Sequence, residues 1–281
     1  MGRLPADARL GAIRLRAGDV GRLSDFYETT IGLEQLDGGG DVVSLGVDGS
    51  PLVELVPGPD APSRPPRSTG LFHLALLVPT RADLARTLRR VAGTGWTLSG
   101  ASDHLVSEAL YLSDPEGNGI ELYRDRPRDE WPIAGDSVEM ATLPLDLERL
   151  LGEPGGETAA ASMPEGTILG HVHLQVADLD AAEAFWVDAL GLDVTARGYP
   201  GALFTSAGGY HHHVGLNTWA GVGAPSPPPG ARGLVRFEVV LPDDAAVDEA
   251  AQRLERVASV ERVDDGVSAT DSSGNTVVVR A

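Results

Sequence analysis

The seven histidines of this chain are confined to its middle. They are His73, His104, His171, His173, His211, His212 and His213. A single histidine in a strand is usually structural, but imidazole also binds divalent metals and exchanges protons near neutral pH. Seven of them in one part of the chain therefore favour a chemical role for that part.

Two of these histidines and one glutamate have the types and surroundings of metal ligands. His73 lies in an apolar strand-like segment (residues 70–79), His171 begins a second one, and Glu121 interrupts the apolar run 120–123. A carboxylate on an apolar sheet face is costly unless it has a partner such as a metal ion. Two histidines and one carboxylate are the ligands of the non-haem iron(II) facial triad. We therefore predict that His73, His171 and Glu121 hold one metal ion.

Composition bounds the classes of protein that remain. A chain of 281 residues with 42% hydrophobic residues is long enough for about two domains. It has no cysteine, and its 22 basic residues are all arginine, which excludes thiolate sites, a Walker A lysine and a pyridoxal-phosphate lysine. A net charge of −19 argues against nucleic acid and anionic membranes as partners. With no apolar run of membrane-spanning length and no signal-like start, we expect a cytoplasmic protein.

An internal repeat must position these residues. LGAIRLRAGDVGRLSDFYETTIGL (10–33) aligns without a gap with LGHVHLQVADLDAAEAFWVDALGL (169–192). A different unit also occurs twice: GLFHLALLVP (70–79) matches GLVRFEVVLP (233–242), and DPEGNGIELYR (114–124) matches DSSGNTVVVR (271–280). The sequence therefore contains four modules, and a repeat of this length is stronger evidence than any short motif.

Each module is predicted to fold as βαβββ. Thr80 can cap a helix that has Leu84, Leu88 and Val91 on one face, and Val247, Ala251, Leu254 and Val257 keep a similar spacing. Strands at 109–113 and 120–124 should flank a turn at 114–118. Residues 127–166 are expected to be a connector with one short helix near 145–151.

The motifs FYxxxIGL and FWxxxLGL after the first strands, with DPEGNGIEL closing the second module, resemble the vicinal oxygen chelate superfamily. This group includes glyoxalase I, fosfomycin-resistance enzymes, bleomycin-binding proteins and extradiol dioxygenases. The second and third modules are most similar to catechol 2,3-dioxygenases. The resemblance implies an α+β fold of four βαβββ modules forming two glyoxalase-like half-barrel domains. Along the chain these would be residues 8–126 (modules 8–58 and 69–126), the connector 127–166, and residues 167–281 (modules 167–220 and 231–281).

The resemblance also implies where a metal can bind, since sites of this superfamily use the first strands of two paired modules and one last strand. The first-strand positions hold Ala12, His73, His171 and Arg236, and the last-strand positions of the second and fourth modules hold Glu121 and Val278. Pairing the second module with the third collects three ligands. Every other pairing fails to do so. We therefore predict the metal site between modules 2 and 3, with modules 1 and 4 as a metal-free pair, an arrangement that departs from the usual dioxygenase order.

The remaining histidines acquire roles from the same resemblance. The run GYHHHVGL (209–216) resembles the strand that carries the acid–base histidine of extradiol dioxygenases, which points to His212. If the run is a strand, His211 and His213 share the opposite face, and His213 is the alternative. His104 in GASDH (100–104) and Tyr111 match substrate-orienting positions. His173, two residues after His171, is a pocket candidate together with His211 and His213.

The predicted activity is ring cleavage of a catechol-type aromatic diol by O2 at iron(II), a step of aromatic compound catabolism. Mn(II), Ni(II) and Zn(II) are alternative ions for the same ligands. A glyoxalase or thiol-transferase metalloenzyme and a bleomycin-resistance-like binding protein stay open as alternatives. No nucleic acid or membrane partner is expected, and a homo-oligomer is compatible with the sequence.

Overall fold

The chain folds into two compact units, seen in a computed structural model that describes residues 2–36, 40–135, 137–264 and 266–281. Unit 1 comprises Met1–Arg16, Ala61–Phe72 and His171–Ala281, and unit 2 comprises Ala17–Asp60 and His73–Gly170. The chain passes from one unit into the other four times: between Asp60 and Ala61, and within strands β1 (Arg9–Ala17), β5 (Gly70–Leu77) and β12 (Ile168–Gln175). Each unit is described below by itself.

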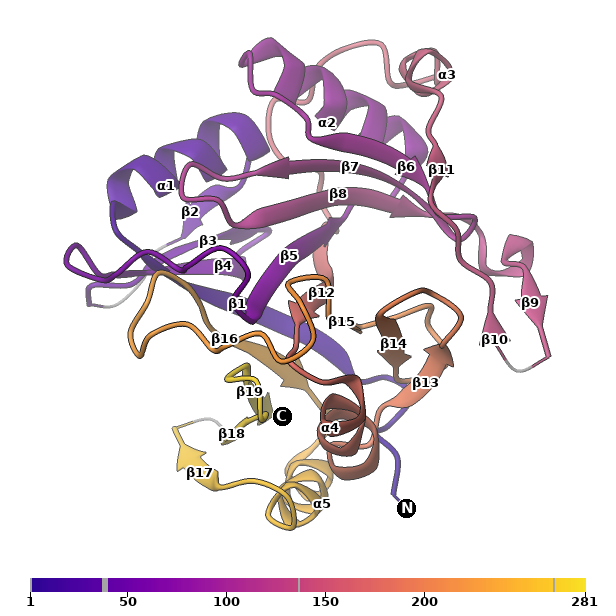
Figure 1. Ribbon diagram of the computed structural model, residues 1–281. Coiled ribbons are helices and arrows are strands. Elements are labelled where there is room, and N and C mark those ends of the chain that lie inside the picture. Colours follow the sequence, from indigo (N-terminus) through magenta and orange to yellow (C-terminus); the bar gives the residue numbers. More distant parts are fainter. Residues whose placement is uncertain (1, 37–39, 136, 265) are drawn as a thin grey trace. The chain divides into compact units, whose positions relative to one another are not determined.

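All four modules have the predicted order of one strand, one helical segment and three strands (Figure 1). After β1, module 1 continues with α1 (Val20–Phe26), the π-helical η1 (Tyr27–Ile31), β2 (Glu34–Leu36), β3 (Val43–Val47) and β4 (Ser50–Pro57). After β5, module 2 continues with α2 (Arg81–Gly93), β6 (Gly100–Asp103), β7 (Ser107–Ser113) and β8 (Gly119–Asp125). After β12, module 3 continues with α4 (Leu179–Glu183), the π-helical η3 (Ala184–Ala189), β13 (Asp193–Ala196), β14 (Ala202–Ser206) and β15 (Val214–Asn217). Module 4 contains β16 (Gly233–Val240), α5 (Asp244–Leu254), β17 (Val260–Val263), β18 (Gly266–Thr270) and β19 (Thr276–Arg280).

In unit 2, helix α2 packs against strand β8 (Figure 1). Strand β5 pairs in parallel with β8, and β7 and β6 follow antiparallel. Helix α2 begins after Thr80, whose side chain accepts a hydrogen bond from Asp83 N, and it buries Leu84, Leu88 and Val91 as predicted. Strands β2, β3 and β4 form an antiparallel meander in the same unit. Tyr123, two residues after Glu121 on β8, is fully buried on the same face of the sheet, where it packs with Ala75 and Ala109.

In unit 1, the first strands of modules 1 and 4 pair with each other. β1 runs antiparallel to β16, with Ile13 opposite Phe237 and Arg14 opposite Arg236. β16 pairs in parallel with β19, and β18 and β17 follow antiparallel. Helix α5 packs against β18 and β19 (Figure 1). β12 pairs in parallel with β15, followed by β14 and β13. Hydrogen bonding thus joins modules that are far apart in the sequence.

The repeated Gly-Leu that ends each FYxxxIGL-type motif has a backbone explanation. Gly32 and Gly191 have φ values of +97° and +103°, which glycine adopts without the steric cost of a Cβ. Gly32 is the C-cap of η1, and Gly191 directly follows Leu190, the C-cap of η3. The repeat therefore conserves a turn of the chain as well as an apolar pattern.

The repeat also preserves one buried contact in each unit. In unit 2, the Tyr27 hydroxyl donates to Asp114 Oδ2 (3.3 Å), and in unit 1, Trp186 Nε1 donates to Asp271 Oδ2 (3.1 Å). Burial raises the pKa of both aspartates although hydrogen bonds from the turn backbone oppose that change. Burial, together with Asp114, also raises the pKa of Tyr27. In both units the aspartate thus connects the turn it begins (114–118 or 271–275) to the π-helical segment (η1 or η3).

Two expectations about elements were wrong. Val257 lies beyond the end of α5 and is 53% exposed, because the chain turns at Glu255–Ala258 before β17. The histidine run is not a strand either, since β15 begins only at Val214.

The connector does contain the predicted helix, α3 (Leu147–Leu151), and it adds a 3-10 turn and the short strands β9 (Ile133–Ala134), β10 (Ser137–Val138) and β11 (Leu143–Pro144). Among the helices of the described residues, none is long and apolar enough to span a bilayer.

Candidate active site

Unit 2 brings His73 and Glu121 together. His73 Nε2 lies 3.0 Å from Glu121 Oε2, and both side chains are buried, at 6% and 3% exposure. Their strands are adjacent: β5 and β8 run in parallel with Ala75 opposite Glu121. Since neither an imidazole nor a carboxylate is buried cheaply alone, this pair has the composition and geometry of two ligands facing one ion.

Tyr111 and His104 extend this site along unit 2. Tyr111 on β7 is the direct cross-strand partner of Glu121, and its ring centroid lies 5.7 Å from that of His73. His104 Nε2 lies 2.6 Å from the Tyr111 hydroxyl, and its Nδ1 lies 2.6 Å from the carbonyl of Ala141. Because a carbonyl only accepts, neutral His104 carries its hydrogen on Nδ1, and its Nε2 accepts a hydrogen bond from the Tyr111 hydroxyl.

His171 lies in unit 1 among two histidines of the run. Its ring centroid is 4.1 Å from that of His212 and 6.1 Å from that of His211, and it is 1% exposed. His211 Nδ1 and His212 Nδ1 are 2.8 Å apart. Strand alternation therefore does not separate His211 from His212, because the run precedes β15 and follows an irregular path. Both touch His171.

His213 has different surroundings. Its Nδ1 accepts a hydrogen bond from Ala207 N (3.2 Å) and lies 2.9 Å from Ser206 Oγ. Its backbone carbonyl accepts from Val172 N (3.0 Å). These contacts hold the His213 ring and backbone at the start of β15.

His173 belongs to an aromatic cluster that the sequence did not reveal. Its ring lies 5.3 Å from Phe72, 5.6 Å from Phe204 and 5.2 Å from Trp219, and Tyr199 lies 6.3 Å from Trp219. The close approach needs Gly215 on β15, since a Cβ there would come within 2.9 Å of the His173 ring. Phe204 also contacts His212, at 4.9 Å. Phe72 (37% exposed) and Trp219 (44% exposed) leave apolar ring surface accessible beside the histidines. In the sequence, the one signal for this aromatic cluster is the position of Phe72 next to His73.

Three buried side chains therefore each offer one ligand atom for a metal: His73, Glu121 and His171. The donors are all nitrogen or oxygen, as suits iron(II), manganese, nickel or zinc. The three residues that the sequence singled out are thus buried and carry donor atoms that could hold a metal ion.

The counterpart positions in modules 1 and 4 have other chemistry. In unit 1, Glu238 Oε2 accepts from Ala12 N (3.2 Å) and from Arg280 Nε (2.9 Å), and Glu238 Oε1 lies 4.0 Å from Arg236 Nη2. Val278 lies opposite Glu238 in the register of β16 and β19. Guanidinium groups surround the carboxylate at this place.

Comparison with known proteins agrees with the fold. Residues 9–122 and 168–278 match the Glyoxalase/Bleomycin resistance protein/Dioxygenase superfamily. The chain therefore belongs to this superfamily, and its two matched segments correspond to two glyoxalase-like domains of α+β fold.

One relative narrows the class of protein within this superfamily. The chain is 43% identical over 271 residues to the catechol-2,3-dioxygenase of Bacillus subtilis strain 168, covering 94% of each chain. The protein is thus an enzyme of the dioxygenase type, an oxidoreductase. Its fold resembles the structure of a putative dioxygenase from Bacillus subtilis (TM-score 0.66, 14% identity, 99% of this chain and 86% of the other). It also resembles glyoxalase I from Zea mays (TM-score 0.58, 16% identity, 98% and 92%).

Proposed function

We propose that this enzyme is an extradiol dioxygenase, which opens the ring of a catechol-type aromatic diol next to the two hydroxyl groups and incorporates O2. The observation that carries the proposal is the buried His73–Glu121 pair, with Tyr111 opposite Glu121 and His104 on the Tyr111 hydroxyl. The 43% identical relative, named a catechol-2,3-dioxygenase, supports the substrate class.

We further propose that His73, Glu121 and His171 hold a non-haem iron(II), within the paired second and third modules. Two imidazoles and one carboxylate leave coordination positions open for two vicinal oxygens of a substrate and for O2. The pairing of β1 with β16 supports the complementary pairing of modules 1 and 4. Bound iron(II) would supply the one-electron chemistry between diol and dioxygen that no side chain of this protein can provide.

The protein's own residues then position the diol and move its protons. His104 donates a hydrogen bond from Nδ1 to the Ala141 carbonyl and accepts one at Nε2 from the Tyr111 hydroxyl. The Tyr111 oxygen, which donates its own hydrogen to His104, can then accept a hydrogen bond from a substrate hydroxyl. His212 Nδ1 lies 2.8 Å from His211 Nδ1, and its ring packs on His171; the imidazole of His212 would take a proton from the diol. The rings of Phe72, His173, Phe204 and Trp219 would hold the aromatic ring and exclude water.

Oxygen consumption tests the proposal directly. Protein purified without added metal would be analysed for metals, loaded anaerobically with iron(II), and mixed with a panel of catechols in an oxygen electrode. We expect oxygen uptake together with a yellow ring-fission product. Glu121→Ala should lose the metal and the activity. Iron-loaded protein that consumes no oxygen with any catechol, yet converts a hemithioacetal, would refute the assignment and leave the superfamily alone.

A further inference from the structure

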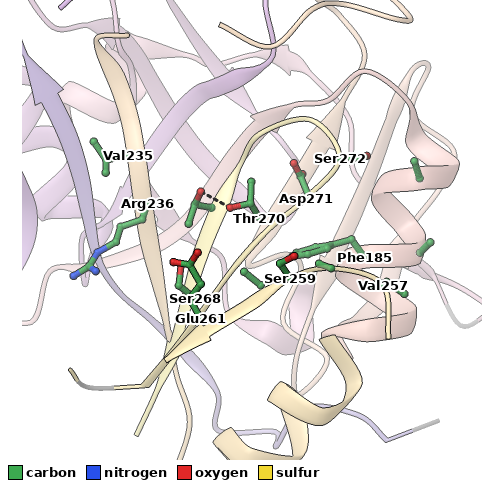
Figure 2. A pocket seen from close by; sticks show the side chains of 15 residues that line it. Phe185, Val235, Arg236, Val257, Ser259, Glu261, Ser268, Thr270, Asp271 and Ser272 are labelled. Carbon is green, nitrogen blue, oxygen red and sulfur yellow. Dashed lines mark hydrogen bonds between the residues drawn. The ribbon is translucent and has the colours of Figure 1, made fainter. Parts of the chain in front are cut away.

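Unit 1 contains a cavity of about 820 Å³ that involves none of the candidate site residues. It lies between the helical segment of module 3 and the sheet of module 4, and Figure 2 shows Phe185 and Ser259 at one end and Arg236 at the other. Val257, Thr270 and Asp271 also line it. Its volume is in the range of about 300–1,000 Å³ that is typical of small-molecule sites.

The internal repeat shows what occupies the corresponding place in unit 2. There the indole ring of Trp96 packs on Phe26, with ring centroids 4.7 Å apart. Trp96 Nε1 donates a hydrogen bond to the backbone carbonyl of Ser113 (2.9 Å). The indole thus bridges the helical segment of module 1 and the last residue of β7.

The two places correspond residue by residue. The bond from Tyr27 to Asp114 in unit 2 has its counterpart in the bond from Trp186 to Asp271 in unit 1. Phe26 directly precedes Tyr27, and Phe185 directly precedes Trp186. Ser113 precedes Asp114, just as Thr270 precedes Asp271. Phe185 and the Thr270 carbonyl are therefore the counterparts of the two groups that Trp96 contacts.

The loop after the helix explains why unit 1 has a cavity there. In module 2, Gly100, which pairs with Tyr111, lies nine residues after Val91. In module 4, Glu261, which pairs with Ser268, lies seven residues after Leu254. The shorter loop places only Val257, Ala258 and Ser259 along the cavity, none of which can reach across it as an indole does.

We propose that this cavity binds a small planar aromatic molecule that carries an N–H or O–H donor, of the size of indole. The ring would lie against Phe185 and the donor would bond to the Thr270 carbonyl, as Trp96 does with Phe26 and Ser113. Aromatic packing and a hydrogen bond to a backbone carbonyl are the usual recognition elements of such a site. The site is separate from the proposed ring-cleavage chemistry and stands independently of it.

Binding of indole to the full-length protein tests the proposal, with ligand-observed NMR and calorimetry as readouts. The wild-type protein should bind one indole per chain in a saturable manner. Ser259→Trp should fill the cavity from within, abolish that binding and raise the melting temperature. Trp96→Ala should open the corresponding place in module 2 and raise the stoichiometry to two.

Matched variants keep the result interpretable. Glu255→Trp adds an indole to the same loop outside the cavity lining and should leave binding unchanged. If Ser259→Trp does not fold, Val257→Trp replaces it as the filling variant. The proposal is overturned if the wild-type protein shows no saturable indole binding, or if a folded filling variant binds indole as well as Glu255→Trp does.

Discussion

His212 and His213 are neighbours in the sequence, but their side chains make different contacts, and we predict different roles for them. The His212 ring lies on His171 and Phe204, whereas His213 Nδ1 accepts a bond from the Ala207 N–H. Replacing one of them should therefore affect catalysis, and replacing the other should affect folding. His211 and His212 are buried, so the run is not a solvated surface segment.

His212→Phe should lower turnover of a catechol by about 10²–10⁴-fold, the usual effect of losing an acid–base group. Its metal content should stay at the wild-type level, because the proposed ligands are retained. Steady-state oxygen uptake and metal analysis of the same preparation check both statements. Loss of the metal in this variant would instead make His212 a ligand.

His213→Phe is the matched control. It removes a partly buried hydrogen bond, and it should lower the free energy of unfolding by about 1–2 kcal/mol. Turnover at saturating substrate should stay within a few-fold of wild type. A loss of turnover equal to that of His212→Phe would restore His213 as the acid–base candidate.

Trp219 tests whether the aromatic cluster holds the substrate ring. Its ring is 44% exposed and packs on Phe72 and His173. Because an aromatic pair contributes about 0.5–1.5 kcal/mol, Trp219→Ala should raise KM for a catechol by about 3- to 10-fold and change kcat less. Ile133→Ala, an exposed apolar side chain of the connector, should change neither constant.

At the scale of elements, the repeat made most of the fold predictable. Each module's strand and helix order follows from apolar spacing, the Thr80 cap and the turns at 114–118 and 271–275. The contact between His73 and Glu121 (3.0 Å) was foreseeable too, since both residues stand out within apolar runs. What could not be read was the path of irregular backbone. The run 211–213 is bound to Thr195, Val172 and Thr205 by backbone and hydroxyl contacts that no local pattern encodes.

Side-chain clusters assembled from distant segments were equally hidden. Phe72, His173, Phe204 and Trp219 come from four different segments, and their meeting depends on Gly215 allowing a close approach. Val257 shows the opposite kind of error, in which the sequence pattern predicts a contact that the structure does not make. Its spacing continues the apolar face of α5, but the chain leaves the helix before reaching it.

Helix α2 is tied to its sheet by ion pairs around the buried Glu108. Arg81 Nε and Arg124 Nη2 each lie 2.8 Å from Glu108 Oε2. Burial alone would raise the pKa of Glu108, but the hydrogen bonds from Arg81 and Arg124 outweigh it and hold the pKa below its ordinary value. A carboxylate with a lowered folded-state pKa contributes stability above its unfolded pKa, and that contribution is lost as the pH falls through the folded pKa.

Glu108→Gln should accordingly lower the free energy of unfolding at pH 7 by about 1–3 kcal/mol, because two partly buried guanidinium groups lose their counter-charge. The difference between wild type and variant should shrink as the pH falls below about 4.3, the ordinary glutamate pKa. Urea unfolding at a series of pH values measures it. A difference that is constant with pH would show that Glu108 acts through shape rather than charge.

On the scale of the whole molecule, the duplicated modules have diverged in charge. Modules 2 and 3 contain all seven histidines and Glu121, whereas the corresponding positions of modules 1 and 4 hold Ala12, Arg236 and Val278. In unit 1, Arg236 and Arg280 approach Glu238, and the backbone N–H of Ala12 donates to the same carboxylate. Modules 2 and 3 thus carry metal-type donors, whereas the corresponding positions of modules 1 and 4 are surrounded by fixed positive charges.

This divergence predicts one metal ion per chain. A guanidinium stays protonated at any physiological pH, so Arg236 and Arg280 repel a divalent cation and already compensate the one carboxylate beside them. Iron(II), manganese and zinc titrated into metal-free protein should each saturate at a single equivalent, and Glu238→Ala should leave that equivalent intact while Glu121→Ala removes it. Bound metal should raise the free energy of unfolding by about 2.7 kcal/mol at a free concentration of 100 times Kd, and that increment should vanish in Glu121→Ala alone. Two equivalents in the wild-type protein, with the second lost in Glu238→Ala, would mean that modules 1 and 4 retain a working site despite their arginines.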